Sequence, residues 1–218
     1  MLTKERVFQI MGKYYGNAYY RSAIEQGIPE VDLILATEVL NKINALGYYF
    51  SNLNALKETE DRRFVPIILD YFQSFMSANY RTGLISAVCY PSYQDFVPNL
   101  LSIYEETTSP QVRLDISQAL LSIRSKRYVS EYLRIINNQN FGVRRDYLID
   151  LLCQLRIKDV LPKLLELLEE NPYEWRWTFL KYASSFNDRS LLPLIEVYSN
   201  SDDSEIRSMA KKAIKRIT

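Results

Sequence analysis

The sequence of 218 residues contains no histidine. This absence excludes catalytic triads that use histidine, imidazole general bases and every metal site with a histidine ligand. The only cysteines are Cys89 and Cys153, which suits a reducing compartment and cannot form a framework of disulfides. Carboxylate and thiol chemistry remain open, but the commonest catalytic groups are missing. We therefore expect no enzymatic activity, no cofactor and no metal.

Long apolar runs and an excess of one charge are also lacking. No apolar stretch approaches the ~20 residues that a membrane-spanning helix needs, and the first residues, "MLTKERVFQIMGKYY", indicate an amphipathic helix rather than a signal peptide. Lys+Arg number 27 and Asp+Glu number 26, so no overall field attracts nucleic acid or anionic lipid. We expect a cytoplasmic monomer that binds neither a membrane nor nucleic acid.

Two sets of residues recur along the chain at intervals of 31 to 32 residues. The first is an aliphatic residue followed by proline, with a serine in one place: Pro66, Pro98, Ser130, Pro162 and Pro193. The second is a column of arginines that each open an apolar-periodic stretch: Arg81, Arg113, Arg144, Arg176 and Arg207. Two independent columns with one period indicate a repeat protein.

Each repeat is predicted to hold two helices. The proline belongs to the first turn of helix A, where its missing N–H costs nothing. Helix B follows a capping residue four places before the arginine, and its apolar residues keep a helical spacing from Val112 to Ile123. The predicted caps are Ser77, Ser109, Asn140 and Asp203, while Pro172 interrupts this column. No strand pattern occurs.

The first third of the chain, residues 1–59, is less regular. "VDLILATEVLNKIN" and "SNLNALKETED" indicate one helix pair, and residues 3–27 supply another. Several tyrosines gather there: Tyr14, Tyr15, Tyr19, Tyr20, Tyr48 and Tyr49. We interpret them as an aromatic cap on the exposed end of a stack of repeats, the alternative being an aromatic binding patch. About seven helix pairs would then form a single domain over residues 1–218.

The segment "NDRSLLPLIEVYSNSDDSEIRSMAKKAIKRI", residues 187–217, resembles the short HEAT repeats of bacteria, also called PBS-lyase-type HEAT-like repeats. "RIKDVLPKLLELLEENPYEWRWTFLKYA", residues 156–183, fits the same register. The resemblance covers residues 60–218 and extends weakly into the first third. It implies an all-α fold, a right-handed α-solenoid of about seven antiparallel helix pairs, with the B helices on its concave side. This fold hosts many unrelated functions.

The arginine column has two interpretations. A basic ladder could bind phosphate or nucleic acid, or each arginine could bond carbonyls and acids of neighbouring turns. We favour the structural interpretation, because a residue kept in every repeat fits a shared packing role better than recognition of one partner.

The B-helix positions one and five residues after each arginine vary between repeats, as a surface specialised for a partner would. We predict a partner-binding surface in the later repeats, formed by Leu114, Gln118, Arg145, Ile149, Trp177, Lys181, Ser208 and Lys212. An apolar strip flanked by cations is typical of a protein interface. The alternative is that curvature buries some of these residues against adjacent B helices. Trp175, by contrast, is predicted to lie in the core.

The sequence thus predicts a non-catalytic solenoid that binds another protein in its concave groove. A stoichiometric inhibitor, such as an immunity protein or antitoxin, is one concrete form. The alternative is a HEAT-like enzyme, either a chromophore lyase or a repair protein similar to the alkylpurine DNA glycosylases, with Asp146 as its carboxylate. The near-neutral charge and the lack of a residue-by-residue motif match disfavour the glycosylase.

Overall fold

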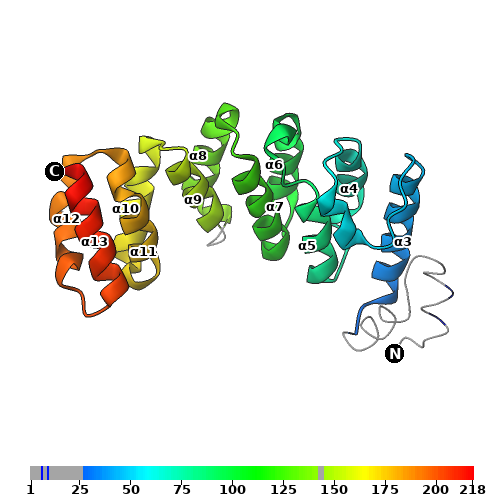
Figure 1. Ribbon diagram of the computed structural model, residues 1–218, viewed down its shortest axis with the longest axis horizontal. Helices are drawn as coiled ribbons and strands as arrows, with labels where there is room; N and C mark the ends of the chain where they lie inside the picture. The colour runs from blue at the N-terminus through cyan, green and yellow to red at the C-terminus, as the bar shows by residue number, and fades with distance from the viewer. Residues whose placement is uncertain (1–5, 7–8, 10–26, 142–144) are drawn as a thin grey trace. The chain divides into compact units, whose positions relative to one another are not determined.

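The computed structural model describes Arg6, Gln9, residues 27–141 and residues 145–218. Every regular element in these residues is a helix, so the all-α prediction is confirmed for this part of the chain (Figure 1). The helix pair predicted within residues 3–27, with its four tyrosines, lies outside the described residues except for Arg6, Gln9 and Gly27. The chain divides into two compact units, Met1–Ser125 and Lys126–Thr218, at a boundary inside the region predicted to hold regular repeats.

In the first unit, each long helix packs against the next long helix along the chain or against the one after that. The elements are α3 (Glu30–Asn44), η2 (Leu53–Glu58), α4 (Phe64–Phe72), α5 (Ala78–Ser86), η3 (Pro91–Phe96), α6 (Val97–Glu106) and α7 (Pro110–Ile123). Helix α3 packs on α4, α4 on α5, α5 on α7 and α6 on α7. The core between them holds large side chains with no exposed surface, among them Leu33, Ile68, Tyr104 and Leu120.

The second unit repeats this pattern. Its longer helices are α8 (Val129–Asn137), α9 (Asp146–Gln154), α10 (Leu161–Glu170), α11 (Pro172–Ala183), α12 (Leu192–Val197) and α13 (Ser204–Ile217). Short 3-10 turns join them: η4 (Lys126–Tyr128), η5 (Gln139–Phe141), η6 (Lys158–Val160), η7 (Ser184–Phe186), η8 (Arg189–Leu191) and η9 (Tyr198–Asn200). Helix α8 packs on α9, α10 on α11 and α12 on α13, while α11 also contacts both α9 and α13. The second helix of one pair therefore packs on the second helix of the next.

The proline column lies in the first turn of the first helix of each pair, as predicted, and α4 begins two residues before Pro66. Helices α6, α10 and α12 start one residue before Pro98, Pro162 and Pro193. Helix α8 starts at Val129, one residue before the serine of the column. Because proline lacks an N–H, it fits the first turn, where that donor has no partner inside the helix.

The capping column is confirmed in part. Ser109 caps α7 by accepting a bond from the N–H of Val112, and Asp203 caps α13 by accepting from two N–H groups of its first turn. The prediction for Asn140 is wrong, because this residue lies in η5 and α9 begins only at Asp146. Where Pro172 interrupts the column, Asn171 caps α11 instead.

The cap of α5 comes from a distant helix. The Ser77 side chain makes no capping bond. The buried carboxylate of Asp32, in α3, instead accepts from the backbone N–H of Met76 at 2.9 Å and from that of Ser77 at 2.5 Å. The prediction of a local serine cap is therefore wrong here, and the start of α5 depends on α3.

Three arginines of the column, Arg81, Arg113 and Arg207, bind backbone carbonyl groups between the two helices of a pair. The acceptors are Phe75 (2.7 Å) and Met76 (2.9 Å) for Arg81, Tyr104 (3.1 Å) and Thr107 (2.7 Å) for Arg113, and Ser201 and Asp202 for Arg207. The acceptors of Arg113 close α6, whose last carbonyls have no partner inside the helix, whereas those of Arg81 and Arg207 lie in the segment that follows the first helix of the pair. The structural interpretation of these three arginines is confirmed.

At the third place in the column, between Arg113 and Arg176, the structure describes Arg145. Its Nη1 donates to the carbonyls of Ile136 at 2.7 Å and Asn138 at 3.3 Å, at the end of α8. Arg144, which the sequence predicts for this place, lies outside the described residues. Arg176 departs from the pattern, since it pairs with a carboxylate of α13 at 3.5 Å and stacks on an aromatic ring of its own helix.

Tyr132, on α8, is fully buried, and its hydroxyl has no hydrogen-bond partner among the described residues. Burial raises the pKa of this hydroxyl. An unpaired buried hydroxyl costs about 1–3 kcal/mol. We therefore expect Tyr132→Phe to raise the free energy of unfolding by about 1 kcal/mol in chemical denaturation. Tyr48→Phe, which removes a bond of 2.6 Å to Asp61, should lower it. A destabilised Tyr132→Phe variant would contradict this account.

Candidate partner-binding surface on the C-terminal unit

Helix α11 turns two aromatic side chains toward solvent. The cap from Asn171 and the proline after it fix where the helix begins. Trp175 and Phe179 then face the core, as predicted for Trp175. Tyr173 is 79% exposed and Trp177 is 43% exposed, four residues apart on one face of the helix. A tryptophan exposed to this extent is a large apolar area that soluble proteins seldom leave uncovered.

Cations from the same helix lie over both rings. The guanidinium of Arg176 is 4.6 Å from the centre of the Tyr173 ring, and the ammonium of Lys181 is 5.0 Å from that of Trp177. Lys181 also lies 3.3 Å from the carboxylate of Asp150, on α9. Burial lowers the pKa of Lys181, but contact with the neighbouring tyrosine and the charge of Asp150 raise it by more. The Lys181 ammonium is therefore charged, and the carboxylate of Asp150 in the same unit balances this charge.

Helix α13 packs on α11 (Figure 1) and carries a basic face. Residues 204, 207, 208, 211, 212 and 215 line one shallow depression along this helix. Ile206, Ala210 and Ala213 face the core on the other side. Lys211, Lys212 and Lys215 are exposed, and none of them makes an ion pair within the described part of the chain. Their charges are thus available to an acidic partner.

The structure separates the eight residues predicted to bind a partner. Trp177 and Lys181 on α11 and Ser208 and Lys212 on α13 are exposed on two helices that pack together. Leu114 and Gln118 are half-buried on α7 and belong to the other unit.

The predicted accessibility of Ile149 and Arg145 is wrong. Ile149 has no exposed surface, and Arg145 is 9% exposed with its guanidinium bound to backbone carbonyls. Ile149 lies on α9 as predicted but is buried, whereas Arg145 precedes the first residue of that helix. The sequence pattern did not indicate Tyr173, Lys211 or Lys215, although each lies about one helical turn or less from a residue that was predicted to bind a partner.

The two cysteines are free, and burial raises the pKa of both thiols, for Cys153 to about 12. A thiol with a raised pKa is a poor source of nucleophilic thiolate. In residues 27–141 and 145–218, no group of three or more cysteine, aspartate or glutamate side chains could hold a metal ion. Within the same residues, no helix has the length and apolar character needed to cross a membrane.

A scan of known protein-family models finds no match for this chain, and a search of curated proteins finds no relative. The resemblance to HEAT repeats therefore stays a prediction that rests on the repeat columns.

Proposed function

We propose that this chain is a non-catalytic protein-binding module, built as a HEAT-like α-solenoid, that engages an acidic partner protein through α11 and α13. The solenoid is supported by the packing inside each unit, where the second helix of one pair contacts the second helix of the next. Three column arginines and Arg145, which bind backbone carbonyls between the two helices of a pair, support the same repeat architecture.

The exposed aromatic pair on α11, together with the unpaired lysines on α13, which packs against α11, is the observation that carries this proposal. Tyr173 and Trp177 provide the flat apolar area on which interface hot spots are usually built. Lys211, Lys212 and Lys215 favour carboxylates around it and would speed association with an acidic protein. A module that acts only by occupying a surface of its partner suits a stoichiometric inhibitor, such as an immunity protein or antitoxin. The two free cysteines support action in the cytoplasm.

Affinity capture with paired variants tests the proposal. We expect the wild-type chain to capture from its native cells a protein whose recovery is lost with Trp177→Ala. For the purified pair, Trp177→Ala should weaken binding by about 2 kcal/mol or more, roughly 30-fold, while leaving the melting temperature unchanged. Lys211→Glu with Lys212→Glu should mainly slow association and reduce its salt dependence.

The matched control is Val197→Ala, which removes an apolar side chain that is 70% exposed at the end of α12. This variant should capture the partner as the wild type does. Equal capture by Trp177→Ala and wild type would refute the proposed surface, and so would unfolding of Trp177→Ala. Recovery of nucleic acid in place of protein would refute the proposed class of partner.

A further inference from the structure

The ammonium of Lys181 lies over two aromatic rings and beside a carboxylate. It is 5.0 Å from the centre of the Trp177 ring and 4.6 Å from that of the Tyr182 ring. It also donates to the Asp150 carboxylate, on α9, at 3.3 Å. A cation and an aromatic face attract each other within about 6 Å. Three groups from two helices therefore fix the end of the Lys181 side chain.

Two of these three groups are themselves held in place. Tyr182 is only 8% exposed, so the core fixes its ring. The second carboxylate oxygen of Asp150 accepts from the amide of Gln154 at 2.8 Å, one turn further along α9. Trp177, by contrast, lies at the surface. The unit therefore holds Lys181, and Lys181 in turn restrains the Trp177 ring.

The other exposed ring of α11 is held in a similar way. The Arg176 guanidinium lies over the Tyr173 ring at 4.6 Å and pairs with the Asp203 carboxylate at 3.5 Å. Asp203 has a fixed position because it also caps α13. Each ring of the exposed pair thus contacts a cation that a carboxylate outside α11 anchors.

The cations of α11 and α13 therefore differ in what they offer a partner. Lys181 and Arg176 already have carboxylates, whereas Lys211, Lys212 and Lys215 make no ion pair within the described residues. An exposed side chain that moves freely before binding loses rotamer freedom when a partner immobilises it, and this loss weakens binding. A ring that is already held in place loses less.

We propose that Lys181 and Asp150 are positioning residues for Trp177, an inference that rests on the proposed surface of α11 and α13. Lys181 holds the indole in the orientation that the partner meets, and Asp150 holds Lys181. The partner contacts α11 with an apolar group and α13 with its carboxylates. In the role predicted from the sequence, by contrast, the charge of Lys181 meets the partner directly.

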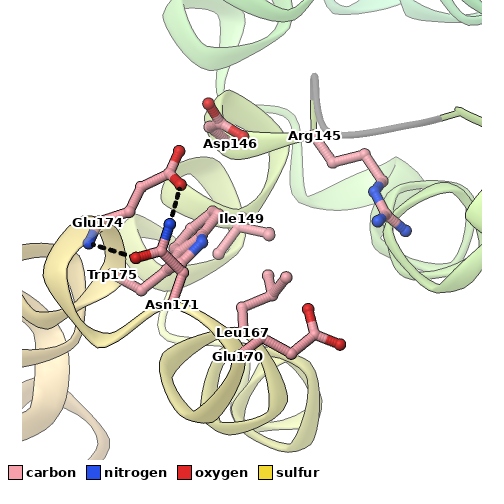
Figure 2. Close-up of a pocket in the computed structure, with 8 residues that line it drawn as sticks. All are labelled: Arg145, Asp146, Ile149, Leu167, Glu170, Asn171, Glu174 and Trp175. Atoms are coloured by element: carbon pink, nitrogen blue, oxygen red, sulfur yellow. Dashed lines mark hydrogen bonds between the residues drawn. The ribbon is translucent and has the colours of Figure 1, made fainter.

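Fluorescence of the free protein tests the positioning of Trp177. The other tryptophan, Trp175, is 8% exposed and lines a pocket together with Ile149 (Figure 2), so quenching by acrylamide reports mainly on Trp177. We expect Asp150→Asn and Lys181→Met each to increase this quenching and the amplitude of fast indole motion in the time-resolved anisotropy. Circular dichroism checks that both variants stay folded.

Two further substitutions provide controls. Lys181→Arg keeps a cation for the ring and for Asp150, so its quenching should resemble that of the wild type. Glu196→Gln removes a different exposed carboxylate of the same unit, on α12, and should leave the quenching unchanged. Unchanged indole motion in Asp150→Asn or in Lys181→Met would overturn the proposal.

The direction of the effect on binding separates positioning from charge. Because the proposed partner is acidic, removal of the negative charge of Asp150 should tighten binding if charge alone matters. We expect instead that Asp150→Asn binds the protein captured by the wild-type chain about 2- to 10-fold more weakly, the effect of one side chain that must be immobilised. Glu196→Gln should not weaken binding. Equal or tighter binding by Asp150→Asn would overturn the proposal.

Trp177→Ala distinguishes this proposal from the proposed surface. A captured protein that needs Trp177 but binds Asp150→Asn like the wild type would refute the positioning alone. Indole motion that increases as expected, with a captured protein that binds Trp177→Ala like the wild type, would support the positioning and refute the surface.

Discussion

Arg81→Ala is expected to lower the free energy of unfolding by about 3–5 kcal/mol, the usual cost of breaking a buried ion pair from one side. The Arg81 side chain is 9% exposed and donates to the carboxylate of Asp115, which is 2% exposed, at 3.2 Å. The substitution strips this carboxylate of its cation and leaves the carbonyls of Phe75 and Met76 without their donor. Chemical denaturation of the purified variant measures the loss.

An exposed pair of nearly the same length provides the control. Arg62 lies 3.1 Å from Asp95, but both side chains are more than 60% exposed. Exposed pairs contribute about 0–1 kcal/mol, so Arg62→Ala should be nearly neutral. Similar losses for Arg62→Ala and Arg81→Ala would show that burial does not determine the effect.

A double-mutant cycle with Arg81→Met and Asp115→Leu distinguishes the stability that the ion pair contributes from the cost of burying its two charged groups. Asp115→Leu should also be strongly destabilising, because it leaves the Arg81 guanidinium buried with carbonyl acceptors alone. Arg81→Met together with Asp115→Leu should lose less than the sum of the single variants, since no uncompensated charge remains. Additive losses would mean that the two residues stabilise the helices independently.

Local signals explain why most helix starts could be predicted. A first-turn proline or a capping side chain acts within three or four residues of its own position, and Pro98, Ser109 and Asp203 therefore do in the structure what the sequence indicates. The structural role of the arginine column could also be predicted, because each helix pair contains a connecting segment whose backbone carbonyls need donors.

The errors occur where distant residues decide. The cap of α5 comes from Asp32, 45 residues before Ser77, so no local pattern could reveal it. Arg145, predicted to face a partner, instead binds the carbonyls of Ile136 and Asn138 near the end of α8, and no local pattern states where those carbonyls lie.

The predicted partner-binding strip failed in part for the same reason. A helical pattern states which residues share a face, but the neighbouring helices decide whether that face is covered. Ile149 on α9 is therefore buried, whereas Trp177 on α11 stays exposed.

Leu120→Ala and Leu151→Ala are each expected to lower the free energy of unfolding by about 2–5 kcal/mol through the cavities that they leave. Both side chains have no exposed surface, Leu120 on α7 and Leu151 on α9. Because one lies in each compact unit, the two variants test the predicted helix phase in both halves of the chain. Urea denaturation followed by circular dichroism measures each loss.

Neighbouring leucines provide controls with identical chemistry. Leu121 and Leu155 are only half-buried, so Leu121→Ala and Leu155→Ala remove the same atoms from sites where solvent already reaches the side chain. Since the cost of truncation grows with the buried volume that is lost, each control should lose clearly less than its buried partner. Leu121 directly follows Leu120, about 100° further around α7. A loss as large for Leu121→Ala as for Leu120→Ala would place the core on a different face of α7 and contradict the phase on which the repeat assignment depends.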